Sequence, residues 1–224
     1  MSVPKIAVFD SGVGGLSILD HLQRSFPHAS FLYWSDPECF PYGIKTEQAI
    51  VQRVSTLLPN LCRHHQPDIL VVACNTVSTH ALDRLRTLIS IPIVGTVPAI
   101  KPAAERSKSK VLGLLATEAT IRSSYTEKLI SEFASDCVWV KVGSAKLVTC
   151  AEKKLKNEPI EMDIIHTELE PFFTNPKLDT VVLACTHFPH LKQEFTRISP
   201  RDIFWIDSGE AIARRVRSFF SPGL

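Results

Sequence analysis

Two cysteines stand in matching contexts along the chain and are the first candidates for chemistry. Each follows an apolar run that opens with aspartate, and each precedes a segment of helical period; Asp68–Ala73 leads to Cys74 and Asp179–Ala184 leads to Cys185. A helix N-terminus offers free N–H groups and the positive end of the helix dipole, which lower the pKa of a thiol. A free cysteine is often only a small buried hydrophobic residue. The repeated context nevertheless favours two reactive thiols.

Two further polar residues accompany these segments. His187 lies two residues after Cys185, where it can tune or protonate that thiol, although a lone histidine is more often structural. Asp10 ends the first apolar run, and a glycine-rich turn from Ser11 to Gly15 follows it. A strand, such a turn and a helix suit an anion held by backbone N–H groups. Because the turn lacks the dinucleotide-binding and P-loop spacings, a small carboxylate fits it as well as a nucleotide does.

Short apolar runs alternate with helical patterns, which predicts an α/β fold with mostly parallel strands. Continuous apolar runs such as Ile69–Ala73 are typical of strands that are buried on both faces. Pro59 interrupts the helical pattern from Glu47 to Cys62, so a kinked or split helix is expected there. The predicted strands are Lys5–Phe9, Ser30–Ser35, Ile69–Ala73, Ile91–Gly95, Lys110–Ala116, Cys137–Val142, Thr180–Ala184 and Ile203–Ile206.

The two cysteine segments also form a faint internal repeat. Both read as aspartate, apolar strand, alanine, cysteine and two polar residues, which indicates two pseudo-symmetric halves. In open α/β sheets, ligands bind at the carboxyl ends of the strands. Two such halves facing one another would bring Cys74 and Cys185 to opposite sides of a single cleft.

The composition narrows the class of protein. The 224 residues carry a formal net charge of +2, which gives no reason to expect nucleic acid or an anionic membrane as a partner. No stretch is long and apolar enough to cross a bilayer, and the first residues lack a signal-peptide pattern, so we expect a cytoplasmic protein. Its six cysteines are then expected to be thiols. No further ligands stand at zinc spacing near Cys185 and His187, so no metal site is expected.

Considered together, these segments resemble glutamate racemase, a family of the aspartate/glutamate racemase superfamily, from one end of the chain to the other. The order of the segments is the order in the family. The matching segments are Phe9–Ser17, Asp36 followed by Pro41–Gly43, Ala73–Thr76, Val94–Gly95 with Val97–Ala99, Ala116–Thr120 with Ser123 and Tyr125, Cys185–Pro189 and Ile206–Gly209.

The resemblance implies two similar, doubly wound α/β domains with the active site in the cleft between them. Residues 1–97 with 207–224 would form the domain that carries Cys74, and residues 98–206 the domain that carries Cys185. It also implies a homodimer that needs neither pyridoxal phosphate nor a metal. The activity would be the interconversion of L- and D-glutamate, which supplies D-glutamate for peptidoglycan.

The resemblance further implies roles for individual residues. Cys74 would take the α-proton of D-glutamate and Cys185 that of L-glutamate, each returning a proton on the opposite face. Asp10 and His187 match positions that assist the thiols, and Glu152 is the closest counterpart of an assisting glutamate. Substrate contacts would come from Ser11, Pro41, Tyr42, Gly43, Asn75, Thr76, Thr117, Thr120 and Thr186, with Thr120 a better match than Thr117, and Asp36 is a further candidate.

Two departures from the family pattern affect these expectations. The chain is shorter than most glutamate racemases, and the missing length falls between about Lys153 and Asp179 and at the C-terminus. Ala184 replaces the glycine that usually precedes the second catalytic cysteine. Its methyl group would crowd the backbone if that position needs a positive φ, but we expect it to be tolerated.

Three other functions fit parts of the pattern. An aspartate racemase would share both cysteine segments, whereas Pro41–Gly43 and Thr117–Thr120 favour glutamate. A binding or regulatory protein of low activity on the racemase scaffold is the alternative that the short chain leaves open. A cysteine hydrolase would need Cys185 and His187 to face each other, which residues two apart at a helix start rarely do.

Overall fold

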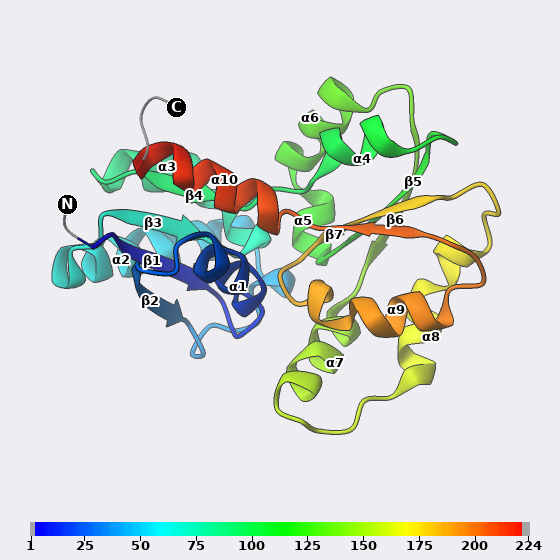
Figure 1. Cartoon of the computed structure of the whole chain (residues 1–224), viewed down its shortest axis with the longest axis horizontal. Helices are drawn as coiled ribbons and strands as arrows, with labels where there is room; N and C mark the ends of the chain where they lie inside the picture. Colours follow the sequence, from blue (N-terminus) through cyan, green and yellow to red (C-terminus); the bar gives the residue numbers. More distant parts are fainter. Residues whose placement is uncertain (1–2, 221–224) are drawn as a thin grey trace.

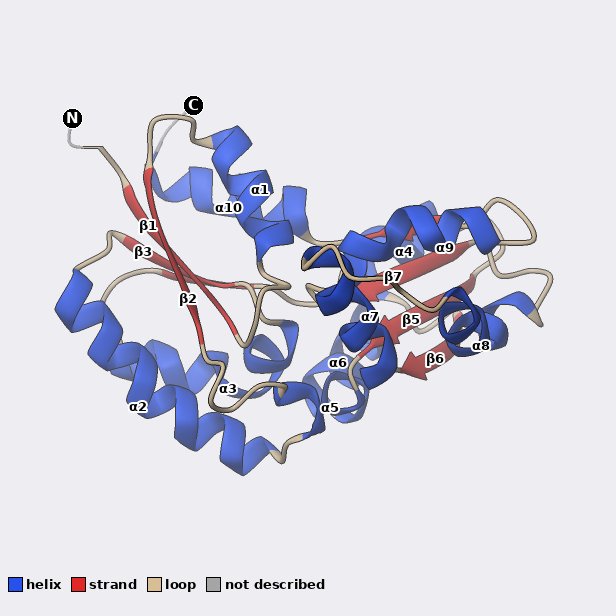
Figure 2. Ribbon diagram, turned by 90° about the horizontal axis from the view of Figure 1, so that it is seen from below, coloured by secondary structure: helices blue, strands red, loops and turns tan. Residues whose placement is uncertain are grey.

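Two separate four-stranded sheets, both entirely parallel, make up the computed structural model, which describes residues 3–220 (Figure 2). Both sheets have the same order, in which the second strand lies at one edge, followed by the first, third and fourth. Every predicted strand is present within two residues of its expected ends. The first sheet holds β1 (Lys5–Asp10), β2 (Ser30–Ser35), β3 (Ile69–Val72) and β4 (Ile93–Gly95); the second holds β5 (Val111–Ala116), β6 (Val138–Gly143), β7 (Thr180–Ala184) and β8 (Phe204–Ile206).

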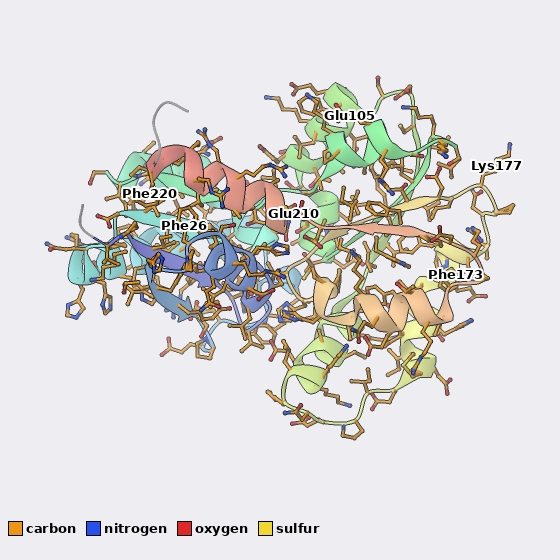
Figure 3. All side chains as sticks on the ribbon, in the orientation of Figure 1. Phe26, Glu105, Phe173, Lys177, Glu210 and Phe220 are labelled. Carbon is orange, nitrogen blue, oxygen red and sulfur yellow. The ribbon has the colours of Figure 1, made fainter. Side chains whose placement is uncertain are left out.

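Helices cover both faces of the first sheet, which is why its central strands are apolar throughout. In β3, Leu70 and Val72 face α2 (Glu47–His65) and α3 (Asn75–Leu88), while Ile69 and Val71 face α1 (Leu16–Ser25) and α10 (Gly209–Phe220). The C-terminal helix α10 thus returns to the sheet on which the chain begins (Figure 1). Its end is held to α1 by the ring of Phe220, whose centroid lies 5.8 Å from that of Phe26 (Figure 3).

The second sheet is enclosed in the same manner. One face packs against α7 (Ala145–Leu155), α8 (Met162–Phe173) and α9 (Lys192–Ile198). The other face packs against α4 (Ile100–Arg106), α5 (Glu118–Arg122) and α6 (Ser124–Phe133). Two short 3-10 turns, η1 (Tyr42–Ile44) and η2 (Phe188–Leu191), complete the structure near the carboxyl ends of the strands. The predicted doubly wound α/β architecture is confirmed.

One of the two alternatives expected at Pro59 is wrong. The helix around Pro59 is not split, because α2 runs as one element past the proline while Leu58 on one side, and Leu61 and Cys62 on the other, pack against the same cluster. The segment after Cys185 is helical, as predicted: His187 is the N-cap of the 3-10 turn η2, and α9 follows directly from Lys192.

The chain passes between the two sheets twice, after β4 and after β8. These two crossings lie together, because the Ser208 hydroxyl donates to the Val97 carbonyl at 2.7 Å. We propose that the domains divide here, as residues 1–97 with 207–224 and residues 98–206; residues 1–2 and 221–224 of this division lie outside the described part. Within residues 3–220, no helix has the length and apolar character required to span a bilayer.

Candidate active site

Cys74 and Cys185 line one cavity of about 130 Å³ between the two sheets. Each cysteine follows the third strand of its own sheet, β3 or β7, so the internal repeat in sequence corresponds to equivalent positions in the two halves. Both side chains are buried, with 5% and 6% of their surface exposed. The cavity is smaller than the roughly 300 Å³ at which pockets for drug-sized ligands begin, and it therefore suits a small molecule.

The surroundings of Cys74 favour the neutral thiol. Cys74 directly precedes α3 as its N-cap, as predicted, but burial and the neighbouring Asp10 raise the pKa of its thiol to about 12. The Val77 N–H and the Ser11 hydroxyl, which lies 3.9 Å from the sulfur, act in the opposite direction and are outweighed. The helix N-terminus thus acts to lower this pKa, as predicted, but desolvation of a fully enclosed thiolate exceeds the effect of the helix end.

Cys185, His187 and Glu152 form a row that leads out of the cavity. Cys185 Sγ lies 3.7 Å from His187 Nδ1, and His187 Nε2 lies 2.7 Å from Glu152 Oε1. Burial alone would lower the pKa of His187, but its contacts with Cys185 and Glu152 raise it to about 10. His187 in turn lowers the pKa of Glu152. The expectation that Cys185 and His187 rarely face each other is wrong, since η2 turns the histidine back toward the sulfur.

Asp10 connects the two halves behind the cavity wall. It is fully buried at the end of β1, and its Oδ2 accepts a hydrogen bond of 2.9 Å from the Thr186 hydroxyl. Its Oδ1 accepts from the Gly12 N–H at 2.8 Å, which shapes the glycine-rich turn. Asp10 does not line the cavity, so its influence on Cys74 is electrostatic.

Two glycines allow the halves to approach closely. A Cβ at Gly14 would lie 2.4 Å from Nδ1 of His187, and a Cβ at Gly43 would lie 2.6 Å from Cβ of Thr117. Neither distance is possible for real side chains, so a larger residue at either position would push the second half away from the cavity.

Most of the predicted substrate contacts meet at the cavity surface. Asn75 is notable among them because its Nδ2 is buried and has no hydrogen-bond partner within residues 3–220. A buried donor without a partner is costly unless a ligand satisfies it. The predicted contacts that line the cavity are Ser11, Pro41, Tyr42, Gly43, Asn75, Thr76, Thr117 and Thr186.

Thr120 and Asp36 lie behind this surface instead. The Thr120 hydroxyl is fully buried and lies 3.1 Å from that of Thr117, so Thr117 forms the wall and Thr120 supports it, the reverse of the sequence preference. Asp36 accepts hydrogen bonds from the Tyr42 hydroxyl and from Arg53, and Arg53 lowers its pKa. Asp36 therefore orients Tyr42 without reaching the cavity.

Ala184 does not crowd the site. The described residues other than glycine with a positive φ are Gln66, Lys110 and Asn157, so the position before Cys185 needs no left-handed conformation. The Ala184 side chain is buried among the residues that pack α4 and α6 onto the second sheet. The methyl group is accommodated, as expected.

Several residues of the cavity wall were not predicted as site residues from the sequence. They come from the residue before Pro41, from the end of η1, from the start of α5 and from the first turns of α7, whose position depends on how the two sheets face each other. These residues are Phe40, Ile44, Glu118, Ala145, Val148 and Thr149.

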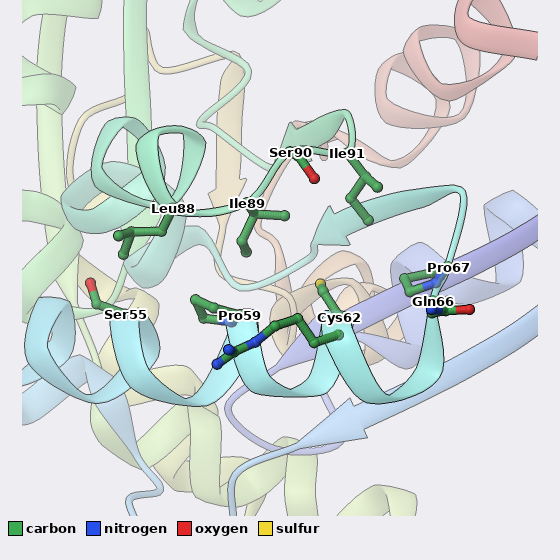
Figure 4. A pocket seen from close by; sticks show the side chains of 10 residues that line it. Ser55, Pro59, Cys62, Gln66, Pro67, Leu88, Ile89, Ser90 and Ile91 are labelled. Atoms are coloured by element: carbon green, nitrogen blue, oxygen red, sulfur yellow. The ribbon is translucent and has the colours of Figure 1, made fainter.

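A larger cavity of about 630 Å³ lies between the C-terminal half of α2 and residues 88–91, and contains none of the predicted site residues (Figure 4). Its one thiol, Cys62, has a pKa that burial raises to about 11. The predicted site residues therefore line the smaller cavity, and none of them lines the larger one.

Comparisons with known proteins agree with this arrangement. A model of the Asp/Glu/Hydantoin racemase family matches residues 16–216. Glutamate racemase of Sodalis glossinidius (strain morsitans) is 48% identical over 213 residues, which cover 95% of this chain and 73% of that relative. Glutamate racemase of Pasteurella multocida (strain Pm70) is 45% identical over 218 residues, covering 97% and 81%. The crystal structure of Escherichia coli glutamate racemase in complex with L-glutamate and the activator UDP-MurNAc-ala superposes with a TM-score of 0.92 at 43% identity, covering 96% of this chain and 82% of that one.

Proposed function

This chain belongs to the Asp/Glu/Hydantoin racemase family, with glutamate racemases as its relatives, and from that membership we propose that it interconverts L- and D-glutamate by proton transfer between two cysteines. The observation that carries the proposal is that Cys74 and Cys185 line the same small cavity from equivalent strand ends. No cofactor takes part in the proposed reaction.

The chemistry explains why two thiols are needed. The α-proton of an amino acid is a very weak acid, and its removal leaves carbanion-like charge beside the carboxylate. A single base tends to return the proton to the face from which it came. Inversion therefore needs one thiolate and one thiol on opposite faces of the α-carbon, with complementary protonation states.

The free enzyme begins with the proton on Cys74. The raised pKa of Cys74 supports a neutral thiol there, and the raised pKa of His187 supports an imidazolium beside Cys185. His187 Nδ1 lies 3.7 Å from the Cys185 sulfur, and the proposed reaction assigns the role of base for L-glutamate to Cys185. In this state the enzyme can act on L-glutamate. Cys185 removes the α-proton, and Cys74 delivers a proton to the other face of the α-carbon. Afterwards Cys185 is protonated and Cys74 is the thiolate.

Neutral donors hold the substrate carboxylates. The cavity lining within residues 3–220 includes no lysine or arginine, so hydroxyl, amide and backbone N–H groups must stabilise the negative charge. The unpartnered Asn75 amide and the hydroxyls of Ser11, Thr76 and Thr186 are suited to this task. Enclosure between two domains strengthens these interactions because water is excluded.

The test of the activity is proton NMR of the purified chain with L-glutamate in D2O, without added cofactor and with L-aspartate in parallel. Loss of the glutamate α-proton signal together with formation of D-glutamate is the expected result. Exchange with aspartate alone would retain the mechanism and change the substrate. No exchange with either amino acid would favour a binding or regulatory protein on this scaffold.

The two-cysteine mechanism predicts that Cys74→Ala and Cys185→Ala each lower racemisation by roughly 10²–10⁴-fold, because each removes one of the two proton carriers. In D2O, the variant that retains Cys74 should exchange only the α-proton of D-glutamate, with retention of configuration. Far-UV circular dichroism provides the control for folding. Unchanged turnover in either variant would rule out the mechanism.

Assembly, location and physiological role follow from the same family. We propose a homodimer, which light scattering would report as twice the mass of one chain, and a cytoplasmic location, which the six free thiols support and cell fractionation would test. The role is supply of D-glutamate for peptidoglycan. Since the Escherichia coli neighbour binds UDP-MurNAc-ala as an activator, that compound is the ligand to add first in a search for activation.

A further inference from the structure

Tyr33 on β2 holds one peptide group of the glycine-rich turn in a fixed orientation. Its hydroxyl donates a hydrogen bond of 2.8 Å to the carbonyl of Gly12. Burial raises the pKa of Tyr33 far above its ordinary value, and the charges of Asp10 and Glu152 raise it further, so the hydroxyl keeps its proton and remains a donor. The contact is tight, because a Cβ at Gly15 would lie only 2.9 Å from the Tyr33 oxygen.

The Gly12 carbonyl belongs to the same peptide group as the Val13 N–H. In a trans peptide these two groups point in opposite directions. Fixing the carbonyl toward Tyr33 therefore directs the N–H away from it, and this N–H donates a long hydrogen bond of 3.5 Å to Oε1 of Glu152. Tyr33 stands on the first sheet, whereas Glu152 stands on α7 over the second.

The same carboxylate oxygen is the partner of His187. Glu152 Oε1 lies 2.7 Å from His187 Nε2, and His187 Nδ1 lies 3.7 Å from Cys185 Sγ. Two groups that share one oxygen restrict its position more than either does alone. The Val13 N–H also contributes to the lowered pKa of Glu152, which keeps the carboxylate charged beside the histidine.

We propose that Tyr33 is a positioning residue for Cys185: through the Gly12–Val13 peptide group it fixes Glu152, and through Glu152 it fixes His187 against the sulfur. The first domain thereby orients the proton-transfer group of the second. This inference rests on the proposed function of Cys185. Tyr33 does not line the cavity, so its effect on the reaction must pass through these hydrogen bonds.

The test is a double-mutant cycle on kcat/KM with Tyr33→Phe and Glu152→Gln. The phenylalanine keeps the ring and leaves the half-buried Gly12 carbonyl without its donor, so kcat/KM should fall about tenfold. In the Glu152→Gln background, the same change should cost less than about twofold, because the path that Tyr33 acts through is already interrupted. Tyr125→Phe on α6 is the matched control and should leave kcat/KM within about twofold of the unchanged chain.

A second readout separates positioning from a general loss of stability. NMR titration of the His187 imidazole should give a lower pKa in Tyr33→Phe than in Tyr125→Phe, because Glu152 is then held less firmly against the ring. If Tyr33→Phe does not fold, the unchanged chain remains testable: the Val13 amide resonance should follow the titration of Glu152 and should lose that response in Glu152→Gln.

The outcomes are distinct. If the unchanged chain exchanges no α-proton, the proposed function fails. If it racemises glutamate but Tyr33→Phe costs the same factor in both backgrounds, or behaves as Tyr125→Phe does, the role of Tyr33 is overturned while the function stands. A Val13 amide that ignores the titration of Glu152 would overturn it as well.

Discussion

His187 is the residue at which the charges of the site meet. It lies between the sulfur of Cys185 and the carboxylate of Glu152, with only 2% of its surface exposed. Burying an imidazolium is unfavourable unless anionic partners compensate for the lost hydration. Here the partners outweigh burial, and the result is a proton held near Cys185 while Cys74 is kept neutral. The asymmetry between the two thiols is therefore a property of their neighbours.

This charge arrangement predicts how stability depends on pH. The pKa of His187 is about 10 in the folded chain and 6.5 ordinarily, so the folded state binds the proton more tightly. Its contribution to stability is complete below pH 6.5 and is lost as the pH rises toward 10. The thermal unfolding temperature should fall across this range, and it should fall less steeply in His187→Asn. Parallel curves for the two proteins would contradict the assignment.

At the scale of elements, α7 determines whether Glu152 reaches the histidine. Its first turn is capped by Ser144, whose buried hydroxyl accepts from the Leu147 N–H at 3.0 Å. Near its other end, Lys154 donates to the carbonyl of His190 and to Glu194, which binds α7 to η2 and α9. Because α7 is fixed at both ends, the position of Glu152 relative to His187 is fixed as well.

The contribution of the Ser144 cap to stability can be measured by mutation. Ser144→Ala should lower the free energy of unfolding by about 1 kcal/mol, because the Leu147 N–H loses its acceptor. Ser124→Ala is the matched control: Ser124 is exposed and the cap of its helix α6 is Ser123, so the change should stay within about 0.5 kcal/mol. Urea unfolding of both variants provides the measurement. Equal losses would show that the Ser144 hydroxyl does not act as a cap.

At the scale of the whole molecule, the two halves are joined on both sides of the cavity. On one side, His190 lies 3.1 Å from the Gly14 carbonyl, beside the link between Asp10 and Thr186. On the other side, His80 Nε2 lies 3.1 Å from the carbonyl of Ala119. Contacts of this kind stabilise the closed arrangement of the two halves. We therefore expect the equilibrium between open and closed arrangements to contribute to the apparent affinity for substrate.

His80 allows this coupling to be measured. His80→Leu removes the donor to Ala119, and KM for glutamate should rise about fivefold while kcat changes less, because closure contributes to binding of substrate and transition state alike. Glu47→Gln is the control: Glu47 is the exposed partner of His80 at 3.5 Å, and the change should leave KM within about twofold. Because the two enantiomers are equal in free energy, kcat/KM must fall by the same factor in both directions.

Much of this molecule could be read directly from local pattern. Apolar runs with alternating helical segments predicted all eight strands, since strand burial and helix amphipathicity are properties of neighbouring residues. The repeated aspartate-strand-cysteine segment predicted equivalent positions for Cys74 and Cys185, because parallel strands of like order end at the same edge of a sheet. At Pro59 the helix is not split, since residues on both sides of the proline pack against one cluster.

Local pattern and the family resemblance thus predicted the α/β architecture, the two thiols and most of the residues that line their cavity. How those residues act on one another follows from the fold. The raised pKa of Cys74 depends on complete enclosure, the pairing of His187 with Glu152 joins residues 35 apart, and the exchange of roles between Thr117 and Thr120 depends on which hydroxyl faces the cavity. These are properties of distance and desolvation between separate elements, which the order of residues along one chain does not specify.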